Sequence, residues 1–194
     1  MDMARRIWTA LFIASTAACS WLLMMIAHEA GHVLHAVISG GRVERVVLHP
    51  LVISRTDVSL NPHPQLVAWG GAVWGCALPA AAWVAARCAA PRIEPLLRFF
   101  AGFCLIANGA YLGAGVLAPV GDAADLLRLG TPRWGLALYG ISGLASGLWT
   151  WHGLGRRFGL QRNEHSHLRR DALAMFGITL VICLIEVLLF RAGE

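Results

Sequence analysis

The stretch IWTALFIASTAACSWLLMMIAHEAGHVLHAVI covers residues 7–38, and its only charged or imidazole side chains are His28, Glu29, His32 and His35. About 20 apolar residues suffice for a helix to cross a bilayer, so this run is long enough. Ionisable groups inside a membrane helix are costly unless they pair with one another or bind something. The stretch therefore predicts a membrane helix that carries a functional cluster of polar side chains.

The rest of the chain is similarly apolar. Of its 194 residues, 57% are hydrophobic and 14% are charged, and the mean hydropathy is +0.61. Ordinary soluble domains carry roughly 25% charged residues, so the composition excludes that class, and it also excludes a disordered chain. Four further apolar runs are long enough to cross a bilayer, at residues 66–90, 96–118, 134–154 and 172–190. We expect an all-α polytopic membrane protein with about five transmembrane helices.

Glycines mark two of these runs. In the run at 66–90, Gly71 and Gly75 are four residues apart, a spacing typical of close packing between two membrane helices. The run at 96–118 contains small or polar residues that could break the helix or make it re-entrant. These residues are Gly102, Asn108, Gly109, Gly113 and Gly115.

Residues 40–65 separate the first two apolar runs. Gly40-Gly41 is a typical helix stop. Aliphatic residues, many of them β-branched, cluster at 43–48 and 51–53, and three prolines interrupt the segment. This pattern predicts a short β-hairpin-like insert at the membrane surface.

The basic residues indicate a membrane protein rather than a nucleic-acid-binding one. The formal net charge is +5, and all 16 basic residues are arginines. They lie mostly between the apolar runs, where arginine sets membrane topology and contacts lipid headgroups. The five cysteines lie in apolar runs without a Cys-x-x-Cys pair, so neither a disulfide framework nor a thiolate metal site is expected. We therefore expect the lipid bilayer as a partner, and no nucleic acid.

The string His28-Glu-Ala-Gly-His32 has the pattern HExxH. Residues four apart on a helix lie one turn apart on nearly the same face, so His28 and His32 can direct imidazole nitrogens at one metal ion. Glu29 follows the first histidine, where its carboxylate can reach a water molecule on the metal. Two histidine ligands, a glutamate base and an open position are the arrangement of zinc hydrolases. The motif predicts that His28 and His32 bind Zn²⁺ and that Glu29 is catalytic.

A zinc site needs a third protein ligand. We favour Asp122, because Pro119 and Gly121 precede it and can break a helix and bring the backbone close to the metal. The alternative role for Asp122 is that of a helix N-cap. The other ligand candidates are Asp125, Glu186, His35 and His63.

Three blocks of the sequence resemble the site-2 protease family of intramembrane zinc metalloproteases, especially its short bacterial members. They are the HExxH string followed by Gly40-Gly-Arg-Val43, the glycine-rich Ala68-Trp-Gly-Gly-Ala-Val-Trp-Gly75, and Gly121-Asp-Ala-Ala-Asp-Leu-Leu-Arg-Leu-Gly-Thr-Pro132. Residues 133–194 match only as apolar spans. The chain departs from the family in two ways. Alanine instead of glycine follows Asp122, and only Pro119 stands where the family often has Asn-Pro-x-Pro.

The resemblance implies a single domain over residues 1–194, with a catalytic core at about 7–133 and additional spans at 134–194. It implies a multi-pass integral protein of the bacterial plasma membrane. Such a protein would hydrolyse peptide bonds in or next to transmembrane segments of membrane-protein substrates.

The resemblance also implies roles for single residues. His28, His32 and Asp122 would hold Zn²⁺, Glu29 would act as the base, and Asn108 matches the family's substrate-positioning asparagine. Two other functions are compatible with the sequence. One is a non-catalytic metal-binding membrane scaffold, which would not require Glu29. The other is a metal transporter, which would carry ionisable residues in several spans.

Overall fold

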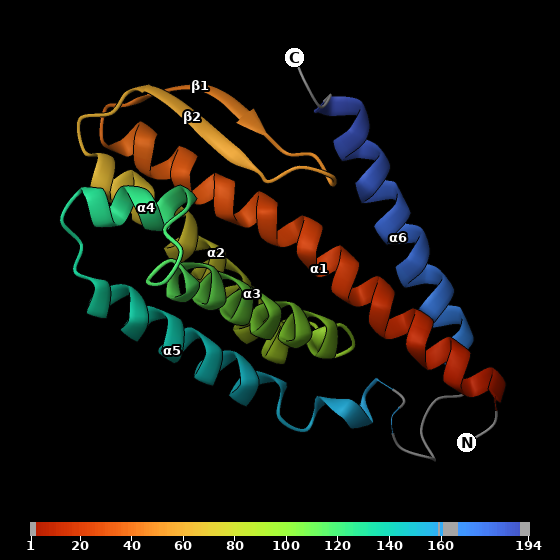
Figure 1. Ribbon diagram of the computed structural model, residues 1–194. Helices are drawn as coiled ribbons and strands as arrows, with labels where there is room; N and C mark the ends of the chain where they lie inside the picture. The colour runs from red at the N-terminus through yellow and green to blue at the C-terminus, as the bar shows by residue number, and fades with distance from the viewer. Residues whose placement is uncertain (1–2, 159, 161–166, 191–194) are drawn as a thin grey trace.

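The computed structural model describes residues 3–158, 160 and 167–190 (Figure 1). Helices dominate these residues, and a two-stranded antiparallel sheet follows the first helix. The elements are α1 (Met3–Ile38), β1 (Arg42–Val47), β2 (Arg55–Leu60), α2 (Pro64–Ala89), α3 (Glu94–Ala114), α4 (Gly121–Arg128), α5 (Arg133–Trp151), the 3₁₀ turn η1 (Leu154–Arg156) and α6 (Leu168–Leu189). The all-α class with a small hairpin after the first helix is confirmed.

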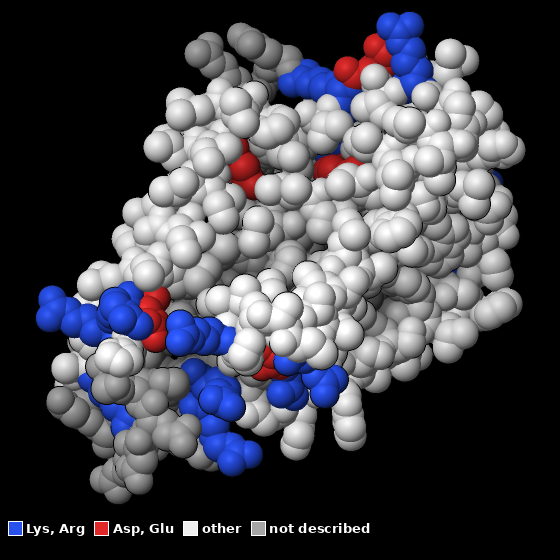
Figure 2. Space-filling view, turned by 180° about the vertical axis from the view of Figure 1, so that it is seen from behind, with Lys and Arg blue, Asp and Glu red and all other residues white. Residues whose placement is uncertain are grey.

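All five expected spans form helices, but within the described residues only α1, α2, α3 and α6 are long and apolar enough to cross a membrane. Of the about five spans expected, the structure therefore supports four. The exception is α5, in which glycine, serine and threonine replace aliphatic residues at many positions. On the face shown in Figure 2, arginine side chains gather mainly toward two opposite ends of the molecule, with a broad band of uncharged residues between them.

Glycines allow α3 and α5 to pack backbone against backbone, and they do not break α3. A Cβ added at Gly109 would lie 3.0 Å from the Cα of Gly143, and one added at Gly113 would lie 3.1 Å from the Cα of Gly140. The helix α3 continues to Ala114, so the predicted break or re-entrant segment does not occur there. Because glycine has no side chain, the two helix backbones can approach this closely.

The same kind of contact brings α1 against α2. Gly31 and Gly70 face each other so closely that a Cβ on either would overlap the carbonyl group of the other. Because Gly31 lies between the two histidines of the HExxH string, this contact presses the histidine-bearing turn of α1 onto α2. The crossing point of the two helices therefore determines what surrounds His28 and His32.

The hairpin forms as expected, but its second strand lies later in the chain than the aliphatic residues at 51–53. Strand β2 begins at Arg55, which pairs with Val47, and residues 51–53 belong to the connecting turn. Leu51 and Ile53 are 85% and 88% exposed there. The aliphatic run was misleading because Pro50 has no backbone N–H to donate to a ladder, so pairing resumes only beyond the turn. Gly40, with φ +77°, ends α1 as its sequence predicts.

The helix α6 packs against the N-terminal half of α1. The hydroxyl of Thr179 donates a hydrogen bond to the Ser15 carbonyl at 3.0 Å, and Phe12 and Met175 share one buried cluster. Figure 1 shows α6 close to the beginning of α1 and farther from α1 toward its own C-terminal end. The histidine-bearing part of α1 is thus enclosed by α2, α3, α4 and the hairpin.

Candidate metal centre

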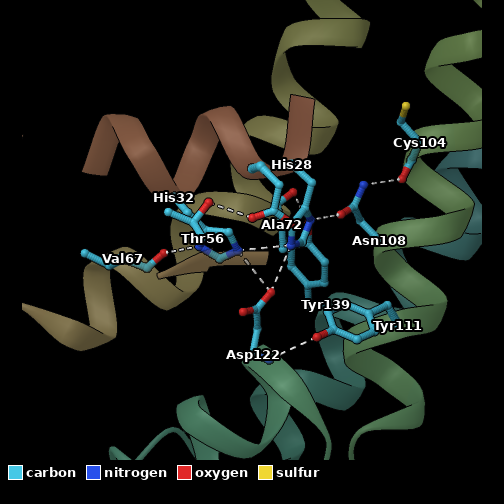
Figure 3. A network of polar contacts seen from close by, with 11 residues as sticks. His28, His32, Thr56, Val67, Ala72, Cys104, Asn108, Tyr111, Asp122 and Tyr139 are labelled. Carbon is cyan, nitrogen blue, oxygen red and sulfur yellow. Dashed lines mark hydrogen bonds and ion pairs between the residues drawn. The ribbon is translucent and has the colours of Figure 1, made fainter. Parts of the chain in front are cut away.

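The two histidines of α1 meet as their spacing predicts. Their Nε2 atoms are 3.1 Å apart, and both residues are buried. Figure 3 shows the two rings directed toward the same point, with Asp122 approaching from the opposite side. One turn of a single helix therefore supplies two nitrogens to one site.

Asp122 supplies the third group from the first turn of α4. Its Oδ2 lies 2.9 Å from Nε2 of His28 and 3.3 Å from Nε2 of His32. It does not cap the helix, because no side-chain cap bond is present at the start of α4 and its carboxylate points to the histidines. Burial acts to raise the pKa of Asp122, but hydrogen bonds from the protonated histidines and their positive charge outweigh burial and hold that pKa well below its usual range.

The outer nitrogens of both rings are held by oxygens. Nδ1 of His32 lies 2.7 Å from the carbonyl oxygen of Val67, and Nδ1 of His28 lies 2.7 Å from Oδ1 of Asn108. A carbonyl oxygen only accepts, so Nδ1 of His32 carries the hydrogen. Asn108 donates its own amide hydrogen to the carbonyl of Cys104 at 2.9 Å, which orients its oxygen toward His28. Both Nδ1 atoms are therefore donors, and in their neutral form the rings present the lone pairs of Nε2 to the site.

The three inner atoms fit a metal ion. Two imidazole lone pairs and a carboxylate oxygen repel one another at these distances unless a cation or a proton lies among them. Ligand atoms about 2.0–2.2 Å from a tetrahedral ion lie about 3.3–3.6 Å apart, close to the 2.9–3.3 Å separations here. His28, His32 and Asp122 could thus hold a metal ion. Two nitrogens and one oxygen suit zinc and other borderline divalent ions better than calcium or magnesium.

Glu29 lies beside these three residues and is held from the hairpin. The hydroxyl of Thr56 in β2 donates a hydrogen bond of 2.7 Å to its Oε2. Glu29 is only 2% exposed, yet it lines a cavity of about 1320 Å³ together with the three candidate ligands. This cavity extends along residues 50–58 of the hairpin, so water or an extended peptide has room beside Glu29.

Three contacts of the site are not evident from the sequence. They involve the Val67 carbonyl, the Thr56 hydroxyl, and Tyr111, whose oxygen accepts a hydrogen bond from the backbone N–H of Asp122 at 3.0 Å. Gly121 has φ +51°, and a Cβ there would overlap the Tyr111 hydroxyl, so glycine is required for this approach. A tyrosine eleven residues before Asp122 is the only sequence signal, and it is weak.

The other ligand candidates lie outside the cluster. Asp125 is exposed and pairs with Arg128 at 3.0 Å. His35 uses Nδ1 on the Leu66 carbonyl at 2.6 Å and accepts a hydrogen bond from Trp74 through Nε2. His63 is exposed ahead of α2, and Glu186 is buried in α6, where no described residue bonds its carboxylate oxygens.

Asn108, expected to position the substrate, is 1% exposed and forms hydrogen bonds with His28 and Cys104. Its amide therefore orients a candidate ligand in this structure. It also lines the cavity, so contact with a substrate stays a prediction.

Gly71 lies at the close contact between α2 and α1, as expected, and there it leaves room for the histidine nitrogens. A Cβ there would overlap Nε2 of both His28 and His32. We expect Gly71→Ala to weaken metal binding by about 10–100-fold, the range typical of changes around a metal site. The matched control is Gly177→Ala in α6, where an added Cβ meets nothing within 4 Å. Isothermal titration with Zn²⁺ measures both, and equal affinities would show that the methyl is accommodated.

The geometry offers a place for one divalent ion with the Glu29 carboxylate beside it, inside a cavity bordered by a β-strand. Its donors come from α1 and α4, and its supporting groups come from α2, α3 and β2. Comparison with family models, with curated proteins and with solved structures finds no match for this chain.

Proposed function

We propose that the chain is a zinc-dependent endopeptidase of the membrane that hydrolyses peptide bonds in or next to transmembrane segments. The observation that carries this proposal is the convergence of His28, His32 and Asp122 beside Glu29 within one cavity. The three blocks that resemble the site-2 protease family support it, since the convergent residues come from the first and third of those blocks. The four long apolar helices and the uncharged band between the arginine-rich ends support a location in a bilayer.

In this proposal each residue has a defined task. Zinc, when bound, supplies a Lewis acid that polarises a carbonyl and lowers the pKa of a bound water to about 7. Val67 and Asn108 fix the ring orientation of His32 and His28. Glu29 takes a proton from the attacking water and passes it to the leaving nitrogen, so that one water is consumed and the base is regenerated.

The substrate must reach this site in an extended form. Peptide bonds of a transmembrane helix are hydrogen-bonded within the helix, so the scissile segment has to unwind. The cavity wall formed by β2 suits such a segment, because a strand edge can bond to an extended backbone. A membrane protein with a locally unstable transmembrane helix is therefore the substrate class.

The test is cleavage of a model transmembrane substrate by the purified chain in detergent, before and after metal removal. Chelation should abolish cleavage, and Zn²⁺ should restore it, whereas Mg²⁺ should not. Cleavage that persists after chelation would contradict the proposal. Stoichiometric zinc without cleavage of any tested substrate would favour the metal-binding scaffold, and Zn²⁺ uptake into proteoliposomes would favour the transporter.

A further inference from the structure

The hairpin reaches the candidate catalytic base through a single side chain. Thr56 is the second residue of β2 and pairs with Val46 of β1, so the sheet fixes its backbone. Its hydroxyl donates to Oε2 of Glu29 at 2.7 Å, and no other hydrogen bond to Glu29 from a described side chain is present. The carboxylate is thus oriented by a residue from a different element of the fold.

This contact gives the two carboxylate oxygens of Glu29 different surroundings. Oε2 is occupied by the Thr56 hydroxyl, which keeps its own hydrogen. Oε1 has no partner among the described residues, and Glu29 lines the cavity, so Oε1 is the atom left to receive a proton from water. Without the hydroxyl, the carboxylate could rotate about its side-chain bonds, and a misplacement of about 1 Å can cost about 100-fold in rate.

We infer that Thr56 is a positioning residue for Glu29, and that the hairpin thereby sets the alignment of the catalytic base. This inference rests on the proposed peptidase function. It assigns the hairpin a part in the chemical step in addition to any contact with substrate. The residues at 50–58 line the same cavity, so a segment lying along β2 also contacts the strand that aligns Glu29.

Two substitutions separate the hydroxyl from the rest of the side chain. Thr56→Val keeps the shape of threonine and removes the hydrogen bond, whereas Thr56→Ser keeps the hydroxyl and removes a methyl group. Ser59→Ala is the matched control, since Ser59 is also on β2 but its hydroxyl donates to the Glu44 carboxylate of β1. All three are compared with the wild-type chain in zinc content, kcat and KM on one transmembrane substrate.

We expect Thr56→Val to lower kcat by about 10–100-fold with KM within about threefold and zinc content unchanged. Thr56→Ser should stay within about threefold of the wild-type kcat, and Ser59→Ala should match the wild type. An unchanged kcat in Thr56→Val would overturn the inference. Equal losses in Thr56→Val and Thr56→Ser would also overturn it, because the hydroxyl that serine retains would then not preserve the rate.

A thermal double-mutant cycle in detergent tests the contact without any activity measurement. Thr56→Val should lower the unfolding midpoint in the wild-type background and should have no further effect when Glu29→Ala has already removed the acceptor. Additive shifts would overturn the inference. Absence of cleavage by the wild-type chain would instead contradict the proposed function, and this outcome is distinct from cleavage that Thr56→Val leaves unchanged.

Discussion

Glu29→Gln should reduce cleavage of a transmembrane substrate by about 10²–10⁴-fold, the contribution that a positioned general base typically makes. Glutamine keeps the size of glutamate and can still accept the Thr56 hydrogen bond through its amide oxygen, but it cannot take a proton from water. Glu29 is not one of the three converging groups, so zinc binding should persist. Single-turnover cleavage together with metal analysis of the same preparation measures both quantities.

This experiment separates an enzyme from a protein that only binds metal. A scaffold would retain all its properties in Glu29→Gln. Equal cleavage by the variant and the wild type would remove Glu29 from the mechanism. Loss of zinc from the variant would show that the carboxylate belongs to the metal site itself.

The second large effect concerns the third ligand. Asp122→Ala should lower zinc affinity by more than about 100-fold, since it removes a direct ligand, and loss of an outer-shell partner alone costs about 10–100-fold. Asp125→Ala is the matched control, because Asp125 lies in the same short helix but is exposed and pairs with Arg128. Metal analysis after dialysis against a weak chelator distinguishes the two variants.

Zinc content in the two variants decides which aspartate is the ligand. Zinc retained by Asp122→Ala and lost by Asp125→Ala would contradict the site described above. Zinc lost by both would indicate that α4 unfolds, which circular dichroism and the thermal midpoint would reveal. Asp122→Asn refines the result, because it keeps the shape of the side chain and one neutral oxygen.

The parts of this protein that could be predicted from sequence are those encoded locally. The periodicity of a helix places His28 and His32 on one face, and the glycines after Ile38 end that helix. Pro119 and Gly121 interrupt the helical pattern before Asp122, and the structure places its carboxylate within 3.3 Å of both histidines. In each case a few neighbouring residues determine the outcome.

The parts that could not be predicted depend on how distant segments meet. Which carbonyl accepts from His32 depends on the crossing of α1 and α2 at Gly31 and Gly70, and no local pattern encodes that crossing. Thr56 reaches Glu29 only because β2 begins at Arg55, after the aliphatic run at 51–53 that the sequence offers as a strand. A shift of one residue along a strand turns every side chain to the other face, so the partner of the base depended on a register that the sequence leaves open.

The aspartate of the candidate metal centre lies 94 residues after His28 and comes from a helix of only eight residues. An ion bound there would fasten that short helix to the first one and close a long chain loop. Part of the binding free energy would then oppose unfolding, because the unfolded chain offers no preformed site. Depletion of the ion would therefore remove a link between the two helices as well as the metal needed for the proposed reaction. During synthesis, this link could not form until residue 122 had been added to the chain.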